Sequence, residues 1–330
     1  MLHLRIRATM LLVATSLLAT GMAPGITCAQ GQSVSPAAAP GRSSPPAPIV
    51  KEGKTIRVSE HVHVIPDERV PMVPNVGIVV GEKATLVIDP GMGRRSGEAV
   101  LREVRKLART DDLVIANTHF HPEHTTGDLA FPATVRLFRA RAQQQDVDEM
   151  GMKFVEMFSG MRPALAEILQ GASFRTPTEL FDRETAVDLG GVRVRMIRLG
   201  PGHTRGDTAF HVEGDSVLFT GDLAMRNLFP SFISPQSSAI SWLDSLDQLD
   251  RLAAVRVVPA HGDLADRTVI GAYRDYIKAL QRRVAELKRA GSSSAEVASQ
   301  LQTEFAVRHP DWAGPERIAG AATVIYNETR

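Results

Sequence analysis

Short apolar runs separated by turn residues fill much of the chain after position 50. Residues 55–58 and 61–65 alternate apolar and polar positions, which predicts strands with one buried face. Residues 76–80 and 84–88 are apolar along their length, and the glycine-containing connection at 81–83 predicts a hairpin between them. The last of these runs ends at Asp89, so a carboxylate is predicted at the tip of a buried strand.

Beyond this hairpin, predicted strands alternate with helical patterns. Apolar residues at positions 100, 101, 104 and 107 predict a helix over 96–108, with Ser96 as its N-cap. Further strands are predicted at 113–116, 134–138, 192–197, 209–212, 216–219 and 255–258, and helices at 140–171, at 240–252 and over most of the chain from 266. This alternation indicates a layered α/β protein, in which the loops at strand ends usually carry the site.

The stretch from Thr118 to His124 (THFHPEH) places three histidines and a glutamate directly after the predicted strand 113–116. Alternate residues of an extended segment point the same way, so His119 and His121 can reach one ion together. Glu123 and His124 follow, in position to serve a second ion or to orient water. Imidazoles and carboxylates are ligands of zinc, iron and manganese, so the stretch predicts a metal site.

Other chemistry-bearing residues also follow predicted strands. His203, Asp222 and His261 each lie in a loop that contains glycine or proline after an apolar run. Separated segments of this kind can converge at strand ends and enclose a pair of metal ions. His61 and His63 alternate in the same way as His119 and His121, but a strand face at the surface explains them equally well.

Five motifs in order carry a family resemblance: IDPG, THFHPEH, GHTRGD, TGD and AHGD. They resemble the motifs of the metallo-β-lactamase superfamily, and their order and strand context cover residues 55–265. The resemblance implies an α/β (α+β) fold, a four-layer αββα sandwich with metals at the rim between two β-sheets. The helices predicted from 266 onward would be additional to that sandwich.

The resemblance also implies a role for each candidate ligand. His119, His121 and His203 would hold a first ion, His124, His261 and Glu123 a second, and Asp222 would bridge the two. Asp89 would orient ligands without binding metal itself. Two Zn²⁺ per chain are expected, with iron or manganese as the other candidates.

Two positions bear on the chemistry. Glu123 stands where the family usually has aspartate, and its additional methylene moves the carboxylate by on the order of 1 Å. It could bind the second ion or act as a general base. β-Lactamases of the superfamily generally have cysteine or serine at position 222, whereas an aspartate is similar to the bridging residue of glyoxalase II-like thioesterases, lactonases and phosphodiesterases.

This site implies a hydrolase in which water attacks the carbonyl of a lactam, lactone, ester or thioester, with Glu123 or Asp222 relaying the proton. An iron-dependent oxidoreductase of the same fold, a nuclease and a non-catalytic metal-binding protein are the alternatives. No flavin-binding domain follows the sandwich, and the large insert of the nucleases is missing from the sequence, so hydrolysis is favoured.

Substrate selection is predicted to fall to loops around the site, and the substrate is expected to be a small molecule. Arg205 and Arg226 could clamp a carboxylate, although a structural ion pair is the commoner role of such an arginine. Phe229 could belong to an apolar wall, and the segment 138–182 could form a lid. The C-terminal extension 266–330 could pack on the sandwich or form a homodimer interface.

Composition restricts the partners. The chain has 330 residues and is 43% hydrophobic, so it can bury a large core. Its 38 basic and 37 acidic residues leave a net charge of +1 and form no basic run, so no nucleic-acid partner is expected.

The N-terminus predicts export. Arg5 and Arg7 precede an apolar segment at 8–20 that is too short to span a bilayer, which is typical of a signal peptide over 1–29. A linker rich in proline, alanine and serine is predicted at 30–50, before the site-bearing domain at 51–265. We therefore expect a periplasmic or secreted protein with no stable membrane insertion after cleavage. A lipid anchor on Cys28 is not expected, because the residues before it match a lipoprotein cleavage site poorly.

Overall fold

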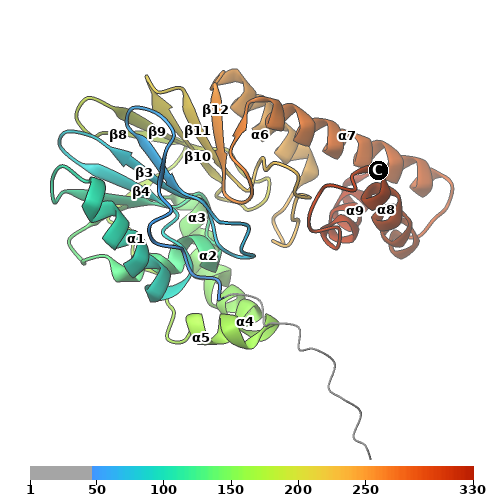
Figure 1. The fold of residues 1–330 in the computed structure, drawn as a ribbon. Helices are drawn as coiled ribbons and strands as arrows, with labels where there is room; N and C mark the ends of the chain where they lie inside the picture. The colour runs from blue at the N-terminus through green and yellow to red at the C-terminus, as the bar shows by residue number, and fades with distance from the viewer. Residues whose placement is uncertain (1–46) are drawn as a thin grey trace, which may run out of the picture. The chain divides into compact units, whose positions relative to one another are not determined.

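The computed structural model describes residues 47–330, in which two β-sheets pack face to face between outer helices (Figure 1). This arrangement confirms the predicted four-layer sandwich with further helices at the C-terminus. The signal peptide predicted at 1–29, with Cys28, and linker residues 30–46 lie outside the described residues. No helix within 47–330 is long and apolar enough to cross a membrane.

The first sheet contains seven strands in chain order. They are β1 (Ile56–Arg57), β2 (Val62–Ile65), β3 (Val76–Val80), β4 (Thr85–Ile88), β5 (Leu113–Ala116), β6 (Arg136–Ala140) and β7 (Glu179–Phe181). The pairs from β1 to β4 are antiparallel, which confirms the predicted hairpin, and the pairs from β4 to β7 are parallel.

The second sheet contains six strands, in the order β13-β12-β11-β10-β9-β8. They are β8 (Glu184–Asp188), β9 (Arg193–Arg198), β10 (Thr208–Glu213), β11 (Val217–Gly221), β12 (Arg256–Pro259) and β13 (Ala265–Asp266). Strands β11 and β12 are parallel, and helix α6 (Ala239–Arg251) connects them, while the other pairs are antiparallel. The apolar runs of the sequence predict most of these strands, but β7, β8 and β13 are short or polar and were not predicted.

Each sheet buries both of its faces because apolar residues on successive positions point to opposite sides. In β3, Val79 belongs to the core between the sheets, whereas Ile78 packs under helix α1 (Gly93–Leu107). In the second sheet, Phe219 of β11 faces the first sheet and Leu218 faces the helices α6 and α7. The result is helix, sheet, sheet and helix in succession.

The predicted helical stretch 140–171 is broken into pieces. It consists of α3 (Arg141–Asp146), a π-helical turn η2 (Val147–Gly151), α4 (Met152–Met161) and α5 (Pro163–Ile168). Pro163 cannot continue the hydrogen bonding of α4, so a new helix begins there. The ends of the segment 138–182 belong to β6 and β7 of the first sheet, and only its middle is helical.

Three helices follow the sandwich: α7 (Thr268–Arg289), α8 (Ser294–Arg308) and α9 (Arg317–Glu328). Ser293 and Glu296 form a capping box at the start of α8. The apolar stripe of α7, including Tyr273, Ile277 and Leu280, lies in one core with α6 and the second sheet. In Figure 1, α8 and α9 lie together beside the C-terminal part of α7.

Gly77 allows the two sheets to approach each other closely. A Cβ atom at this position would lie 2.5 Å from Cε1 of the buried Phe219 ring. Gly77→Ala is therefore expected to lower the free energy of unfolding by about 1–3 kcal/mol, measured by urea denaturation. The control is Gly271→Ala in α7, where a Cβ meets nothing within 4 Å and helix propensity favours alanine. An unchanged urea midpoint for Gly77→Ala would contradict the packing described here.

Candidate metal centre

The predicted ligands meet at one edge of the sandwich because their loops leave the ends of neighbouring strands. Strand β5 ends at Ala116 and leads to His119, His121 and the short helix α2 (Pro122–Thr125), which carries the glutamate and the third histidine. The remaining ligands lie between β9 and β10, directly after β11 and shortly after β12; they are His203, Asp222 and His261. Each of the seven lies in one of three groups that could hold a metal ion.

Three imidazole nitrogens form the first group. His121 Nδ1 lies 3.0 Å from His119 Nε2 and 3.2 Å from His203 Nε2. Two ligands on a tetrahedral zinc ion with Zn–N bonds of about 2.0–2.1 Å are about 3.3 Å apart, so this spacing suits one ion. The three rings are buried, with exposures of 1–2%.

The second group combines carboxylates with the remaining histidines. His124 Nε2 lies 3.7 Å from Glu123 Oε1 and 4.0 Å from Asp222 Oδ1. His261 Nε2 lies 3.8 Å from the same oxygen of Asp222. The other oxygen of Asp222 lies 3.6 Å from His203 Nε2, so this carboxylate stands between the two groups.

The second ring nitrogen of every histidine in the site faces an oxygen. His119 Nδ1 lies 3.0 Å from Thr118 Oγ1, which itself donates to Asp89 and is therefore available to accept. The other nitrogen–oxygen contacts are His121 Nε2 to Ser234 Oγ at 3.1 Å, His203 Nδ1 to Ser231 O at 2.6 Å, His124 Nδ1 to Asp89 Oδ2 at 3.0 Å and His261 Nδ1 to Val73 O at 2.8 Å. When these nitrogens carry the protons, the lone pairs of the five opposite nitrogens point inward.

Asp89 lies at the centre of these supporting contacts. Its carboxylate accepts from Thr118 N and Thr118 Oγ1, both at 2.7 Å, as well as from His124. Its backbone is left-handed, with φ at +55°, a conformation that aspartate tolerates better than most residues. This strained position directs the carboxylate at the end of β4 toward the histidine loop.

Several supporting residues were not singled out by the sequence patterns. Asp207 accepts from the backbone N–H groups of Gly202, His203 and Thr204, which fixes the loop before β10. The turn that carries His261 is held by two further residues. They are Asp67, which accepts from Gly262 N, and Asn75, which donates to Pro259 O and Gly262 O. Asp207 is visible as the last residue of the GHTRGD motif, but Asn75 has no local signature.

Burial and neighbouring charges shift the pKa values of the site residues in different directions. Burial and the surrounding imidazoles hold the pKa values of His119 and His121 well below the ordinary range. Burial also raises the pKa of Glu123 to about 7. Burial lowers the pKa of His124, but Asp89 and the carboxylates of Glu123 and Asp222 outweigh it and raise the pKa to about 9.

The residues fit a pair of metal ions. Glu123 Oε2, His124 Nε2 and Asp222 Oδ1 are buried and have no hydrogen-bond partner within residues 47–330. Unpaired buried polar atoms are costly unless something else binds them, and all three point to the same edge. The donors are nitrogen and oxygen only, which suits zinc, iron or manganese.

Two of the predicted substrate-binding residues, Arg205 and Phe229, are engaged in contacts within the protein. Arg205 forms a bidentate ion pair with Glu149, with nitrogen–oxygen distances of 3.0 and 2.6 Å. Its Nε also lies 3.3 Å from Asp146 Oδ1. Phe229 is buried among the aromatic rings of the C-terminal helices, including Tyr276 and Trp312. These placements favour structural roles for both residues.

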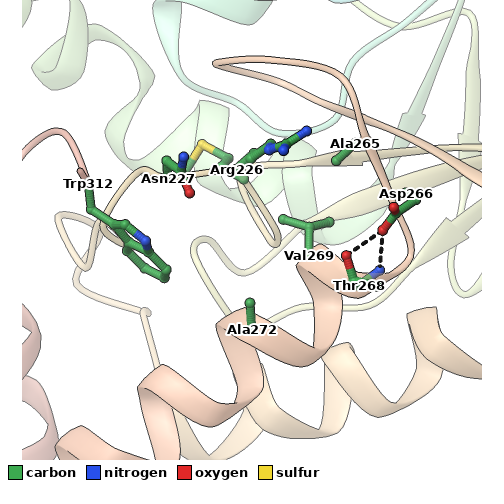
Figure 2. A pocket seen from close by; sticks show the side chains of 9 residues that line it. Arg226, Asn227, Ala265, Asp266, Thr268, Val269, Ala272 and Trp312 are labelled. Atoms are coloured by element: carbon green, nitrogen blue, oxygen red, sulfur yellow. Dashed lines mark hydrogen bonds between the residues drawn. The ribbon is translucent and has the colours of Figure 1, made fainter. Parts of the chain in front are cut away.

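Arg226 lies beside a cavity of about 170 Å³ between the loop after β11 and the start of α7 (Figure 2). Trp312 and Asn227 border this cavity on one side, and Asp266 and Thr268 on the other. None of its nine lining residues is a metal-ligand candidate, so the cavity is not part of the metal centre.

Comparison with known proteins places the chain in a family. The model of the Metallo-beta-lactamase superfamily matches residues 69–261, which is more than half of the chain. An uncharacterized protein of Mycobacterium tuberculosis is 27% identical over 203 residues, which cover 58% of this chain and 84% of the relative. An acyl-coenzyme A thioesterase of Gallus gallus is 26% identical over 200 residues, which cover 57% and 72%. A linear primary-alkylsulfatase of a Pseudomonas species is 23% identical over 218 residues, which cover 56% and 40%.

Solved structures share the fold. A stereoselective inverting sec-alkylsulfatase from a Pseudomonas species superimposes with a TM-score of 0.64 and 16% identity, and covers 83% of this chain. This chain spans only 50% of that sulfatase. A beta-lactamase domain protein from Burkholderia ambifaria has a TM-score of 0.61 and 18% identity, with 87% of this chain and 90% of that one covered.

Zinc binding is expected to release a proton from His124. At pH 7.5 this ring carries a proton because its pKa is about 9, and its Nε2 must lose it to bind metal. Asp89→Asn removes the charge that raises this pKa, so we expect about one proton fewer to be released. Calorimetry in two buffers of different ionisation enthalpy measures the number.

The matched control is Asp215→Asn, which removes the carboxylate that lies 2.8 Å from His61 Nδ1, outside the site. Its proton release should equal that of the unmodified protein. Equal release from Asp89→Asn as well would show that Asp89 does not control the protonation of His124.

Proposed function

The chain belongs to the metallo-beta-lactamase superfamily, and from this membership and the converging ligands we propose that it is a metal-dependent hydrolase. The observation that carries the proposal is the set of five histidines and two carboxylates in three overlapping groups, with Asp222 within contact distance of histidines from each. Water would be activated there for attack on an ester-type bond. His119, His121 and His203 would hold the first ion, and His124, His261 and Glu123 the second.

The site's own residues can account for the proton movements. Metal held by these residues would lower the pKa of a bound water and polarise the bond under attack. Glu123 Oε2 has no hydrogen-bond partner within the described residues, so it is available to accept a proton from water. Asp222 is the alternative acceptor, and as the bond to the leaving group breaks, whichever of the two carboxylates took the proton returns it to the leaving group. The five imidazoles keep their outward-facing N–H groups throughout, because oxygens of the protein accept from them.

An acyl thioester is the first substrate class to test. The similarity to an acyl-coenzyme A thioesterase supports it, and so does aspartate at position 222, which the thioesterase-like members share. A sulfate ester is the second candidate, because a linear primary-alkylsulfatase is also a relative. Lactones and lactams are the remaining substrate classes to test. The predicted export signal supports testing lactams, since periplasmic members of the superfamily include β-lactamases.

The proposal also includes the location of the protein, its partners, its metal and its oligomeric state. The protein would act in the periplasm or outside the cell on a small molecule, without a nucleic-acid partner. Zinc is proposed in preference to iron or manganese, and iron would point to the oxidoreductase alternative. Packing of α7 against the second sheet accounts for the apolar stripe of that helix, while a homodimer through the C-terminal helices remains a proposal.

The decisive experiment measures metal content and turnover together. Purified mature protein should contain about two zinc ions per chain and hydrolyse at least one of an acyl thioester, an alkyl sulfate, a lactone, a lactam and a phosphodiester. His121→Ala should lose metal and at least a thousandfold of the turnover, because its Nδ1 lies at the centre of the first group. Activity that survives complete removal of metal would contradict the proposal.

His63→Ala is the matched control, since His63 belongs to the other alternating histidine pair of the chain. It lies in β2 and is a member of none of the three candidate metal groups. Metal content and turnover should both remain unchanged.

A further inference from the structure

One asparagine side chain joins the two ends of the histidine loop. Asn117 follows strand β5, and its Nδ2 donates to His124 O at 3.0 Å and to Asp128 Oδ1 at 3.1 Å. Both partners are acceptors, so this atom is the amide nitrogen, and each of its two hydrogens has a partner. The loop at 118–124, which carries four of the candidate ligands, is therefore closed at its base.

Asp128 keeps Asn117 in this orientation. It lies in the 3-10 helix η1 (Thr126–Ala130), and its side chain is fully buried. Asn117 is buried as well, and its Oδ1 has no hydrogen-bond partner within residues 47–330. The two acceptors of Nδ2 therefore determine which way the amide points. Without the aspartate, one buried N–H would lose its partner, and the asparagine would no longer be held against His124 O.

A buried ion pair connects Asp128 to the segment 138–182. Asp128 Oδ2 lies 3.6 Å from Arg139 Nη2, and neither side chain is exposed. Arg139 belongs to strand β6, and its Nη1 donates to Gln144 Oε1 at 2.7 Å and to Arg175 O at 3.1 Å. The guanidinium thus offsets the charge of the buried carboxylate and ties it to the chain on both sides of α4 and α5.

The first metal group is held from a different part of the fold. The loop after β11 supplies the oxygens of two serines to the rings of His121 and His203. A parallel β-bridge between residues 228 and 313 fixes this loop to the C-terminal extension. The buried asparagine and aspartate take no part in these contacts. A change at the aspartate should therefore affect His124 more than the first group.

We propose that Asp128 is a positioning residue of the second metal group, which acts through Asn117 to fix the backbone of His124. The inference rests on the proposed function, because it requires the second ion, and it adds a residue outside the ligand set that controls the affinity for that ion. Asp128 hydrogen-bonds to Asn117 and would not touch the metal or the substrate. Loss of such a supporting residue typically weakens metal binding by about ten- to a hundredfold.

Two double variants that lack the buried ion pair test this role. Asp128→Asn with Arg139→Met keeps an oxygen that can accept from Asn117. Asp128→Leu with Arg139→Met removes that oxygen, and the branched leucine side chain keeps water out of its place. Neither variant leaves a buried charge unpaired, so they differ mainly in the acceptor.

Zinc titration of the metal-free protein against a competing chelator measures the two dissociation constants. The leucine variant should bind the second zinc about ten- to a hundredfold more weakly than the asparagine variant, while the constants for the first zinc agree within about threefold. Urea denaturation establishes that both variants are folded. If the leucine variant is not, Asp128→Ala with Arg139→Met takes its place, with the same expectation.

A third substitution tests the path of the effect. Asn117→Ala, added to each double variant, should weaken binding of the second zinc and abolish the difference between the two variants. The reason is that no amide remains for the residue at position 128 to hold. A difference that persists without Asn117 would show that Asp128 does not act through it, and would overturn the inference.

The other outcomes are equally distinct. Equal binding of the second zinc by the two double variants, an equal loss at both ions, or an unmodified protein that binds fewer than two zinc ions would each overturn the inference. If the variants bind zinc alike while the unmodified protein binds two ions and turns over substrate, the hydrolase proposal stands alone. If the expected difference appears but none of the proposed substrates is hydrolysed, the inference stands and the hydrolase proposal fails.

Discussion

The metal centre depends on hydrogen bonds that point away from it. Five imidazoles can offer lone pairs to the same small space only if each keeps its proton on the opposite nitrogen, and a protein oxygen within 2.6–3.1 Å faces that nitrogen in every case. Each such contact is worth only about 1 kcal/mol in net stability. Their larger effect is on orientation, because a ring with the wrong tautomer would present N–H where the ion must bind.

These oxygens come from loops of both sheets. Asp89 follows β4, Val73 precedes β3, and Ser231 and Ser234 lie in the loop after β11. The two sheets must therefore keep a fixed separation for the supporting oxygens to reach the rings. Gly77 is part of this constraint, since it brings β3 within contact of Phe219 in the opposite sheet. The geometry of the ligands thus depends on the packing between the sheets.

The convergence of the candidate ligands could be predicted from the sequence because metal binding requires a few residue types and these occur directly after apolar runs. The residues that hydrogen-bond to these ligands and hold their loops could not be predicted in this way. Ser234 is an ordinary serine whose contact with His121 spans 113 residues, and Asn75 reaches Gly262 across 187. Strands β7 and β8 were missed for a related reason: their pairing in the sheets holds them in place, and their own residues are mainly polar or exposed.

The β-bridge between residues 228 and 313 has a consequence for evolution and for engineering. Because the extension shares backbone hydrogen bonds with the loop that supports His121 and His203, a shift of either segment moves the other. A chimera that exchanges the helices after β13 would need the loop of its donor, and a substitution in the loop could be compensated from α9. The sandwich and its C-terminal helices should therefore be inherited, and redesigned, as one unit.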